Sequence, residues 1–389
     1  MQPFVLYGMP GSLYTGKVRC YLRKQGIAFE ERTAGDPRFR TEVMPAVGRW
    51  IIPVLQTPDG QMVQDGTDII DFFENQGRAP LSAYPGTPLH RVVALIFELF
   101  GGEGLLRPAM HYRWNFDEDN LVFLRDDFGA ALAAPGSSRE VRQAAFARAS
   151  AAMRQATQAF GVTPATVPLV QTSYRDFLAR FDAHLAESPY LLGGRPTLGD
   201  YGLIAPLFAH LGRDPFPAQL MKQAAPRTWR WVERMNAREQ GAGEFVDRHE
   251  DLFAGDALPD TLKELLRFVA EEYLCEIEAH VAFADEWLSQ RPDIPVGSHG
   301  LEKPGVRAIG MATFFWRGLS ISTLVMPYRL YLLQRVQDAF ESLDQVQRLR
   351  VTAALTEVGL ESMLTLKARR RVERSHHLEV WGTPDAPVH

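Results

Sequence analysis

The stretch FVLYGMPGSLYTGKVRCYL, residues 4–22, contains an apolar run, a break rich in Gly and Pro, and a helical pattern that begins at Ser12. Apolar residues then recur at spacings of three and four, and Gly26 suits the end of a helix. The pattern predicts a strand over residues 4–7 and a helix over residues 13–25, which start a β-α-β unit. Ser is a preferred N-cap residue, so Ser12 either caps this helix or does chemistry at its N-terminus.

The residues from 27 to 77 extend this unit. Residues 27–32 suit a second strand, and residues 35–50 are irregular and contain several Pro and Gly residues. In IIPVLQTPDGQMVQ, residues 51–64, two short runs flank a Pro-Asp-Gly turn, which is typical of a hairpin. Residues 67–75 form a helix with one apolar face, which stops at Gly77. The predicted order is β-α-β-α-β-β-α.

The length of 389 residues predicts more than one domain. We assign residues 1–78 to the α/β domain, 79–88 to a linker, 89–245 to an all-helical domain, and 246–389 to a helical extension. The helical domain carries an insert near residues 115–165. In the extension, apolar spacing marks a long helix from Leu262 to Val281, and two more helical stretches are predicted over residues 306–343 and 346–373.

Composition excludes several classes of function. The chain has 42 Lys and Arg against 47 Asp and Glu, a net charge of −5, so nothing points to nucleic acid. The most apolar late stretch, residues 308–333, contains two arginines and a proline and is not expected to cross a membrane. Cys20 and Cys275 are far apart and the N-terminus does not resemble a signal peptide, so we expect a reducing, cytoplasmic location.

Three local features of the first domain point to one ligand. Pro53 lacks an amide proton and marks a strand start or an edge; a cis Ile52-Pro53 bond would turn the Ile52 backbone outward, towards an extended ligand. Gln64 to Thr67 sit at a helix N-terminus, where free amides favour a carboxylate. Ser12 marks another helix N-terminus. Together these features suit a short acidic peptide with an ionisable group at Ser12.

The same residues resemble the glutathione S-transferase superfamily. GMPGSLYTGKVRCYL is similar to the strand-to-helix segment of its Ser-type classes, and IIPVLQTPDGQMVQDGTDIIDFF is similar to the stretch V-P-x-L … E-S-x-A-I-x-x-Y-L. YLLGGRPTLGDYGLIAPLF resembles the capping-box helix of the family's helical domain, with Thr197 as N-cap and Asp200 three residues on. PRTWRWVERMN resembles its closing helix. The resemblance covers roughly the first 240 residues, allowing a few residues of error.

The resemblance implies a thioredoxin-like first domain that binds glutathione as cosubstrate and a helical domain that holds a small electrophile. Ser12 would stabilise the glutathione thiolate, and Tyr7 is the alternative donor. The residues expected at glutathione are Tyr14, Ile52, Pro53, Asp65, Gly66 and Thr67. Where the family usually has Glu-Ser, this chain has Asp65-Gly66, so one hydroxyl is missing; Thr67 replaces it, or the Gly66 amide serves alone.

The resemblance also implies an electrophile pocket and a homodimer. AMHYRWNF, residues 109–116, suggests His111, Tyr112 and Trp114 as substrate contacts, with core packing as the alternative for Trp114. No metal site is expected, since His376 and His377 are adjacent and lack helical ligand spacing. The expected function is therefore a glutathione transferase. The alternative is a non-catalytic glutathione-binding or interaction protein that uses its extension as a partner surface.

Overall fold

The computed structural model describes residues 3–239, 241–246 and 251–384. The first domain contains a mixed four-stranded sheet in the order β2-β1-β3-β4. Strands β1 (Phe4–Gly8) and β2 (Phe29–Thr33) are parallel, whereas β3 (Val54–Gln56) is antiparallel to β1, and β4 (Met62–Gln64) is antiparallel to β3. This is the predicted thioredoxin-like arrangement.

Helices cover both faces of this sheet. Helices α1 (Leu13–Lys24) and α3 (Gly66–Asn75) bury Val18 and Ile69 against the face that carries Leu6. The other face packs against a π-helical turn, η1 (Phe39–Val43), and the short helix α2 (Met44–Val47), both inside the segment predicted to be irregular. The observed order β-α-β-α-β-β-α confirms the prediction.

The second domain is helical, as predicted. Six of its helices are α4 (Pro88–Leu99), α5 (Leu106–Trp114), α8 (Val167–His184), α9 (Leu198–Ala209), α10 (Pro215–Ala224) and α11 (Pro226–Asn236). A π-helical turn, η2 (Phe100–Gly104), joins α4 to α5. The insert is a pair of packed helices, α6 (Asp117–Leu132) and α7 (Arg139–Ala159). Helix α9 begins with the expected capping box between Thr197 and Asp200.

In the part of the extension that the structure describes, a short 3-10 turn, η3 (Ala254–Asp256), precedes four α-helices. These are α12 (Asp260–Val269), α13 (Cys275–Ser289), α14 (Pro327–Glu341) and α15 (Gln345–Glu357). The predicted long helix is present as α12 and α13, joined by the π-helical turn η4 (Ala270–Leu274). A second 3-10 turn, η5 (Glu361–Leu364), follows α15.

Two β-hairpins correct the helices predicted in the extension. Strands β5 (Gly310–Trp316) and β6 (Leu319–Val325) lie inside the first segment predicted as a helix, and β7 (Arg370–Ser375) overlaps the end of the second and pairs with β8 (Leu378–Pro384). In β5, Phe314 is buried but Phe315 is 76% exposed. Because apolar residues occupy both faces of this strand, its period of two was hidden in the sequence.

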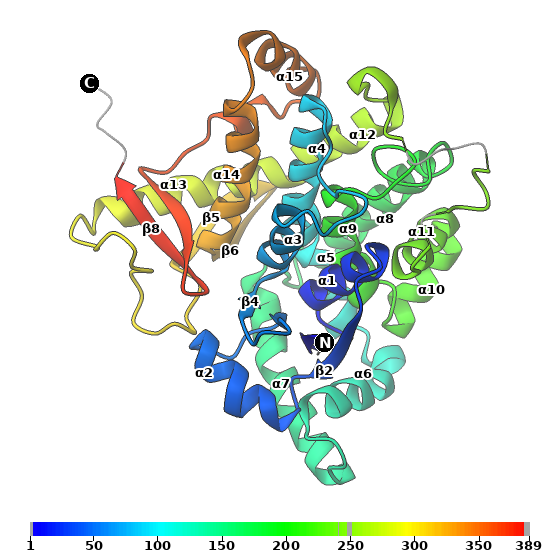
Figure 1. Cartoon of the computed structure of the whole chain (residues 1–389), viewed down its shortest axis with the longest axis vertical. Helices are drawn as coiled ribbons and strands as arrows, with labels where there is room; N and C mark the ends of the chain where they lie inside the picture. The colour runs from blue at the N-terminus through cyan, green and yellow to red at the C-terminus, as the bar shows by residue number, and fades with distance from the viewer. Residues whose placement is uncertain (1–2, 240, 247–250, 385–389) are drawn as a thin grey trace.

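The extension packs against the first two domains (Figure 1). Helix α14 lies against α4, and β7 lies against α14. Tyr328 and Leu332 of α14 belong to the same apolar core as Val18, Ile69 and Val92. Among the helices that the structure describes, none is both long enough and apolar enough to cross a membrane.

Candidate functional site

Ser12 caps α1 in a β-conformation at the end of a tight connection. Its Oγ accepts a hydrogen bond from the Thr15 backbone amide at 3.3 Å, which confirms the capping interpretation. A Cβ at Gly8 would lie 2.3 Å from the Thr15 side chain, so this close approach of strand and helix requires glycine. Ser12 is half-buried, and as a hydroxyl it keeps its own proton to donate while it accepts from Thr15.

The Ile52-Pro53 peptide bond is cis, as expected for the strand start beside Ser12. Ile52 is half-buried and packs against the apolar cluster that contains Met9 and Trp114, so the segment before β3 meets the segment after β1. Pro53 is buried, and its carbonyl accepts a hydrogen bond from the Asp65 amide at 3.4 Å. This bond links the cis peptide to the N-terminus of α3.

Asp65 caps α3 from a backbone conformation with φ of 96°. Its Oδ1 accepts from the Thr67 amide at 2.9 Å and from the Tyr328 hydroxyl at 2.8 Å. Within the described residues no hydrogen bond involves Asp65 Oδ2 or the Gly66 amide. The helix N-terminus predicted near Thr67 is therefore present, and a residue of the extension contacts it.

Thr67 is fully buried, and its hydroxyl faces the interior of the protein. It contacts Lys17 Nζ at 3.0 Å, Glu98 Oε1 at 3.1 Å and the Tyr328 hydroxyl at 3.3 Å. Lys17 and Glu98 also form a buried ion pair. The hydroxyl is fully buried, accepts from Lys17 and gives its one proton to Glu98, so it does not take the place of the hydroxyl missing at Gly66.

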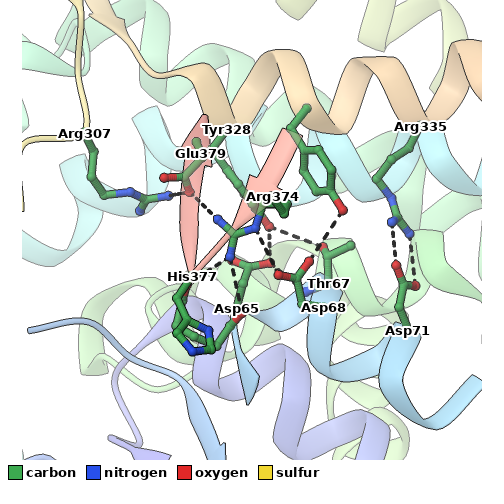
Figure 2. A network of polar contacts seen from close by, with 12 residues as sticks. Asp65, Thr67, Asp68, Asp71, Arg307, Tyr328, Arg335, Arg374, His377 and Glu379 are labelled. Carbon is green, nitrogen blue, oxygen red and sulfur yellow. Dashed lines mark hydrogen bonds and ion pairs between the residues drawn. The ribbon is translucent and has the colours of Figure 1, made fainter. Parts of the chain in front are cut away.

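The β7–β8 hairpin places Arg374 over the outer side of the α3 N-terminus (Figure 2). Arg374 contacts Asp68 Oδ2 at 3.0 Å and Glu379 Oε1 at 2.8 Å. Burial and the neighbouring Asp65 carboxylate raise the pKa of Asp68 to about 6, against the effect of Arg374. The turn of this hairpin is His376 and His377, with φ of 47° and 65°.

Glu379 on β8 contacts three arginines, and Figure 2 shows two of them, Arg307 and Arg374. Arg307 Nη2 lies 2.9 Å from its Oε1, and Arg49 Nη1 lies 3.4 Å from its Oε2, in addition to the Arg374 contact. Burial would raise the pKa of Glu379, but the three guanidinium groups lower it to about 2. This carboxylate is therefore ionised at neutral pH and holds the arginines beside the first domain.

Tyr14 is the second residue of α1, two positions after Ser12, and is half-buried. Its hydroxyl donates to Glu103 Oε1 at 2.7 Å, and the other Glu103 oxygen accepts from Arg329 of α14 at 3.0 Å. Arg329 also contacts Glu276 at 2.7 Å. Burial and Glu103 raise the pKa of Tyr14 well above its ordinary value, so the phenol stays protonated.

Tyr7 is fully buried in β1 on the sheet face that packs against Phe39. Its hydroxyl lies 3.5 Å from Gln56 Oε1. Burial raises the pKa of Tyr7 above its ordinary value, which keeps its phenol protonated. These contacts are those of a core residue.

The three residues suggested for the electrophile pocket lie on α5. His111 and Tyr112 are 1% exposed, and Tyr112 stacks on Phe116 and Phe216 in the helical core. Trp114 instead packs in the cluster that contains Met9 and Ile52, beside the β1–α1 connection. It also lines a cavity with an empty volume of about 620 Å³ between α5, the end of α7 and the start of α8. Tyr112 belongs to the large core cluster and Trp114 to the cluster of Met9, and both clusters include residues of the first domain.

Several residues at the site were not predicted, because they come from parts of the sequence without a matching motif. Arg49 precedes the cis peptide, Glu103 lies on η2, and Arg307, Tyr328 and Arg374 belong to the extension. A clue was available for α14 alone, where charged residues interrupt an apolar stretch. Among the described residues, no cluster of His, Cys, Asp and Glu suited to a metal ion is found.

Family models match both of the first two domains. The model described as glutathione S-transferase, N-terminal domain, matches residues 6–80, and the model described as glutathione S-transferase, C-terminal domain, matches residues 143–234. The insert helix α6 and the extension lie outside both matches. A search of curated proteins finds no match.

Two solved structures are similar to part of the chain. A glutathione transferase from Phanerochaete chrysosporium is 16% identical with a TM-score of 0.43, covering 61% of this chain and 98% of that chain. A beta-etherase from a Sphingobium strain is 18% identical with a TM-score of 0.41, covering 63% and 100%. With the N-terminal and C-terminal domain models matched in order on the observed α/β and helical domains, the chain belongs to the glutathione S-transferase superfamily.

Proposed function

We propose that the chain is a glutathione-dependent transferase, which conjugates glutathione to a small electrophile or displaces a leaving group from it. The observation that carries the proposal is the state of Ser12. Its hydroxyl caps α1 with a lone pair and has its proton left to donate, at a helix N-terminus that favours negative charge. A bound thiolate at this place would receive both stabilising effects.

A thiol with a pKa near ~8.5 is mostly protonated at neutral pH, so this stabilisation matters for the rate. In the proposed reaction the thiol loses its proton to solvent and the sulfur forms a bond to an electrophilic carbon. Either the leaving group departs with its electron pair, or the adduct takes up a proton. Ser12 donates a hydrogen bond to sulfur and forms no covalent bond. Tyr7 remains the alternative donor.

The rest of the glutathione molecule would lie along the cis peptide and the α3 N-terminus. The Ile52 backbone would pair with the cysteinyl residue beside Pro53. The glutamyl carboxylate would meet the Gly66 amide, which has no partner within the described residues, and Asp65 Oδ2 would accept from the glutamyl amine. Tyr14 would form a wall of the site, since its hydroxyl is taken by Glu103.

We assign the electrophile to the apolar side of Ser12. Met9, Met110, Trp114 and Phe160 belong to one cluster there, and Phe160 also contacts the cluster of Leu13. An apolar wall with few polar groups suits a small apolar electrophile. His111 and Tyr112 would not contact the electrophile directly. Their packing in the core would hold α5, which carries Trp114, in position.

The second candidate is a non-catalytic protein of the same fold. It is supported by the burial of Asp65 at 5% exposure under residues of the extension, since a covered α3 N-terminus hinders a ligand. On the family resemblance we also propose a cytoplasmic homodimer. Because α14 covers α4, such a dimer would form through another surface. A monomer in analytical sedimentation would contradict it.

One set of measurements separates the two candidates. Wild type, Ser12→Ala and Ser138→Ala are tested for retention on immobilised glutathione and for conjugation with a panel of electrophiles. Ser138 is a matched control, because its Oγ caps α7 through the Val141 amide at 3.4 Å, away from the site. The transferase proposal expects loss of activity in Ser12→Ala alone.

Absence of glutathione binding at millimolar concentration would refute the transferase. Binding with no conjugation or displacement of any electrophile would favour the non-catalytic protein. Binding with activity that is equal in wild type and Ser12→Ala would keep the enzyme and transfer the donor role to Tyr7.

A further inference from the structure

Gly66 leaves the α3 N-terminus short of one donor for a carboxylate. Thr67 does not supply it, because its hydroxyl is buried among Lys17, Glu98 and Tyr328. The Thr67 amide is likewise occupied by Asp65 at 2.9 Å. The Gly66 and Asp68 amides are left on this turn without a partner among the described residues, and neutral amide donors alone hold a carboxylate weakly.

Arg307 of the extension lies beside this N-terminus and has donors to spare. Its guanidinium carbon lies 5.5 Å from the centre of the Tyr328 ring, and Tyr328 in turn bonds Asp65. Of its nitrogens, Nη2 donates to Glu379 at 2.9 Å, whereas Nε is buried and has no hydrogen-bond partner within the described chain. A buried guanidinium N–H without a partner is costly, so it points to a missing acceptor.

The surroundings of Arg307 are those of the ligand site. Burial acts to lower its pKa, but Glu379, Tyr14 and Asp65 together raise it above the ordinary value for arginine. The group is therefore close to residues on both α1 and the α3 N-terminus. Its side chain remains 27% exposed, while Asp65 is 5% exposed, so a ligand from solvent reaches Arg307 more easily than Asp65.

The Arg307 guanidinium is also held in place by Glu379. Glu379 bonds Arg307, Arg374 and Arg49 at the same time, and Arg49 is itself 7% exposed with an Nε that lacks a partner in the described residues (Figure 2). A guanidinium fixed in this way loses little conformational entropy when it pairs with a carboxylate. Its planar fork of donors matches the two carboxylate oxygens.

We infer that the extension completes the glutathione site within the same chain, with Arg307 pairing with the glutamyl α-carboxylate of glutathione in place of the hydroxyl missing at Gly66. Tyr328 positions Asp65, and Glu379 positions Arg307. This inference rests on the proposed function, because it names a ligand contact of the same site.

The test compares ligands as well as variants by calorimetric titration. The ligands are glutathione, γ-aminobutyryl-cysteinyl-glycine, which lacks the glutamyl α-carboxylate, and glutathione with its glycyl carboxylate converted to an amide. The variants are Arg307→Gln, Arg307→Lys and the control Arg371→Gln, whose partner Asp338 is exposed. Circular dichroism and the unfolding midpoint establish that each variant folds; in Arg307→Gln, Arg49 and Arg374 still hold Glu379.

We expect Arg307→Gln to weaken glutathione binding about tenfold or more, the size of a charge-assisted hydrogen-bonded pair. The glycyl amide should lose affinity by the same factor, because it retains the α-carboxylate. The γ-aminobutyryl ligand should bind wild type and Arg307→Gln equally. Arg307→Lys should fall between them, and Arg371→Gln should match wild type for every ligand.

Four results would overturn the inference while leaving the transferase intact. Equal losses for glutathione and the γ-aminobutyryl ligand would make Arg307 a structural residue. If Arg307→Gln weakens the binding of every ligand except the glycyl amide, Arg307 pairs with the glycyl carboxylate of glutathione instead. Unchanged glutathione binding in Arg307→Gln would show that Arg307 does not contact the ligand. Tighter binding would show that Arg307 hinders the ligand. If wild type fails to bind glutathione at all, the proposed function and this inference fall together.

Discussion

The N-termini of α1 and α3 begin with the same device, a side chain that caps the first turn, but their surroundings differ. Ser12 is half-buried, and Thr15, whose amide donates to its hydroxyl, is three residues away. Asp65 is 5% exposed and bonds Tyr328, which lies 263 positions along the chain. The α1 N-terminus is thus partly exposed and formed by residues close in sequence. The α3 N-terminus is buried and contacted by a residue of the extension. Chemistry is expected at the open one and ligand recognition at the covered one.

The largest expected effect comes from Arg329, which connects the open N-terminus to the extension. It is 1% exposed and contacts Glu103, the partner of Tyr14, and Glu276. Arg329→Met would leave two buried carboxylates without this partner, so we expect a loss of ~3–5 kcal/mol in unfolding free energy. Urea unfolding measures it.

Arg369→Met is the control for this change, because Arg369 and Asp285 form an exposed ion pair. Such pairs are worth less than ~1 kcal/mol. Similar losses in the two variants would mean that the buried contacts of Arg329 do not hold the extension to the first domain.

The second effect concerns the open N-terminus. Ser12→Ala and Ser138→Ala each remove one cap, at a cost of ~1 kcal/mol. Only Ser12→Ala should also raise the pKa of the thiol of bound glutathione, by ~1–2 units, because this substitution removes a hydrogen bond to the thiolate sulfur. Thiolate absorbance against pH measures this pKa, and at neutral pH kcat/KM should fall about tenfold. An unshifted titration curve would return Ser12 to a purely structural role.

The third effect concerns the covered N-terminus. Tyr328→Phe removes the hydroxyl that bonds Asp65 at 2.8 Å, so we expect a loss of ~1–2 kcal/mol in unfolding free energy. Tyr331→Phe is the matched variant on α14, since its hydroxyl lies 3.5 Å from Asp68 and contributes less. Thermal unfolding compares the two. An equal shift would show that the contact at Asp65 has no special strength.

The smallest effect is a pH dependence at the covered N-terminus. The pKa of Asp68 is raised to about 6 in the folded chain, so the folded state binds more protons than the unfolded state between about pH 4 and 6. Unfolding free energy should therefore fall as the pH rises through this window, by no more than ~1 kcal/mol because Asp68 is partly exposed.

Asp68→Asn should remove this slope. Glu276 gives the opposite sign: two arginines lower its pKa to about 2 against burial, so its stabilising contribution is lost as the pH falls below ~4. Urea unfolding across about pH 3 to 7 would separate the contributions of Asp68 and Glu276 to the pH dependence of stability. An unchanged pH profile in Asp68→Asn would contradict the raised pKa assigned to Asp68.

Short-range patterns were sufficient for the first domain. The strand and helix order, the cap at Ser12 and a helix N-terminus at Gln64 to Thr67 were predicted and are present, and the Ile52-Pro53 bond is cis. Each depends on residues within a few positions of one another. The capping box at Thr197 was predicted for the same reason.

The hairpins of the extension were missed, for two physical reasons. In β5, apolar side chains point to both faces, which masks the alternation typical of a strand. In β7, arginines such as Arg370 look solvent-exposed in sequence, but Arg370 is 4% exposed and donates to the Gly382 carbonyl. Burial of a charged side chain depends on partners that a local pattern does not contain.

By itself, the sequence determined the local geometry of the site: where α1 and α3 begin, which residues cap them, and that Gly66 lacks a hydroxyl. Only the tertiary structure decided which groups meet there. It turned the Thr67 hydroxyl inward to Lys17 and brought Tyr328 to Asp65. Capping and turn formation are governed by neighbours in the chain, whereas the pairing of buried charges is governed by distance in space.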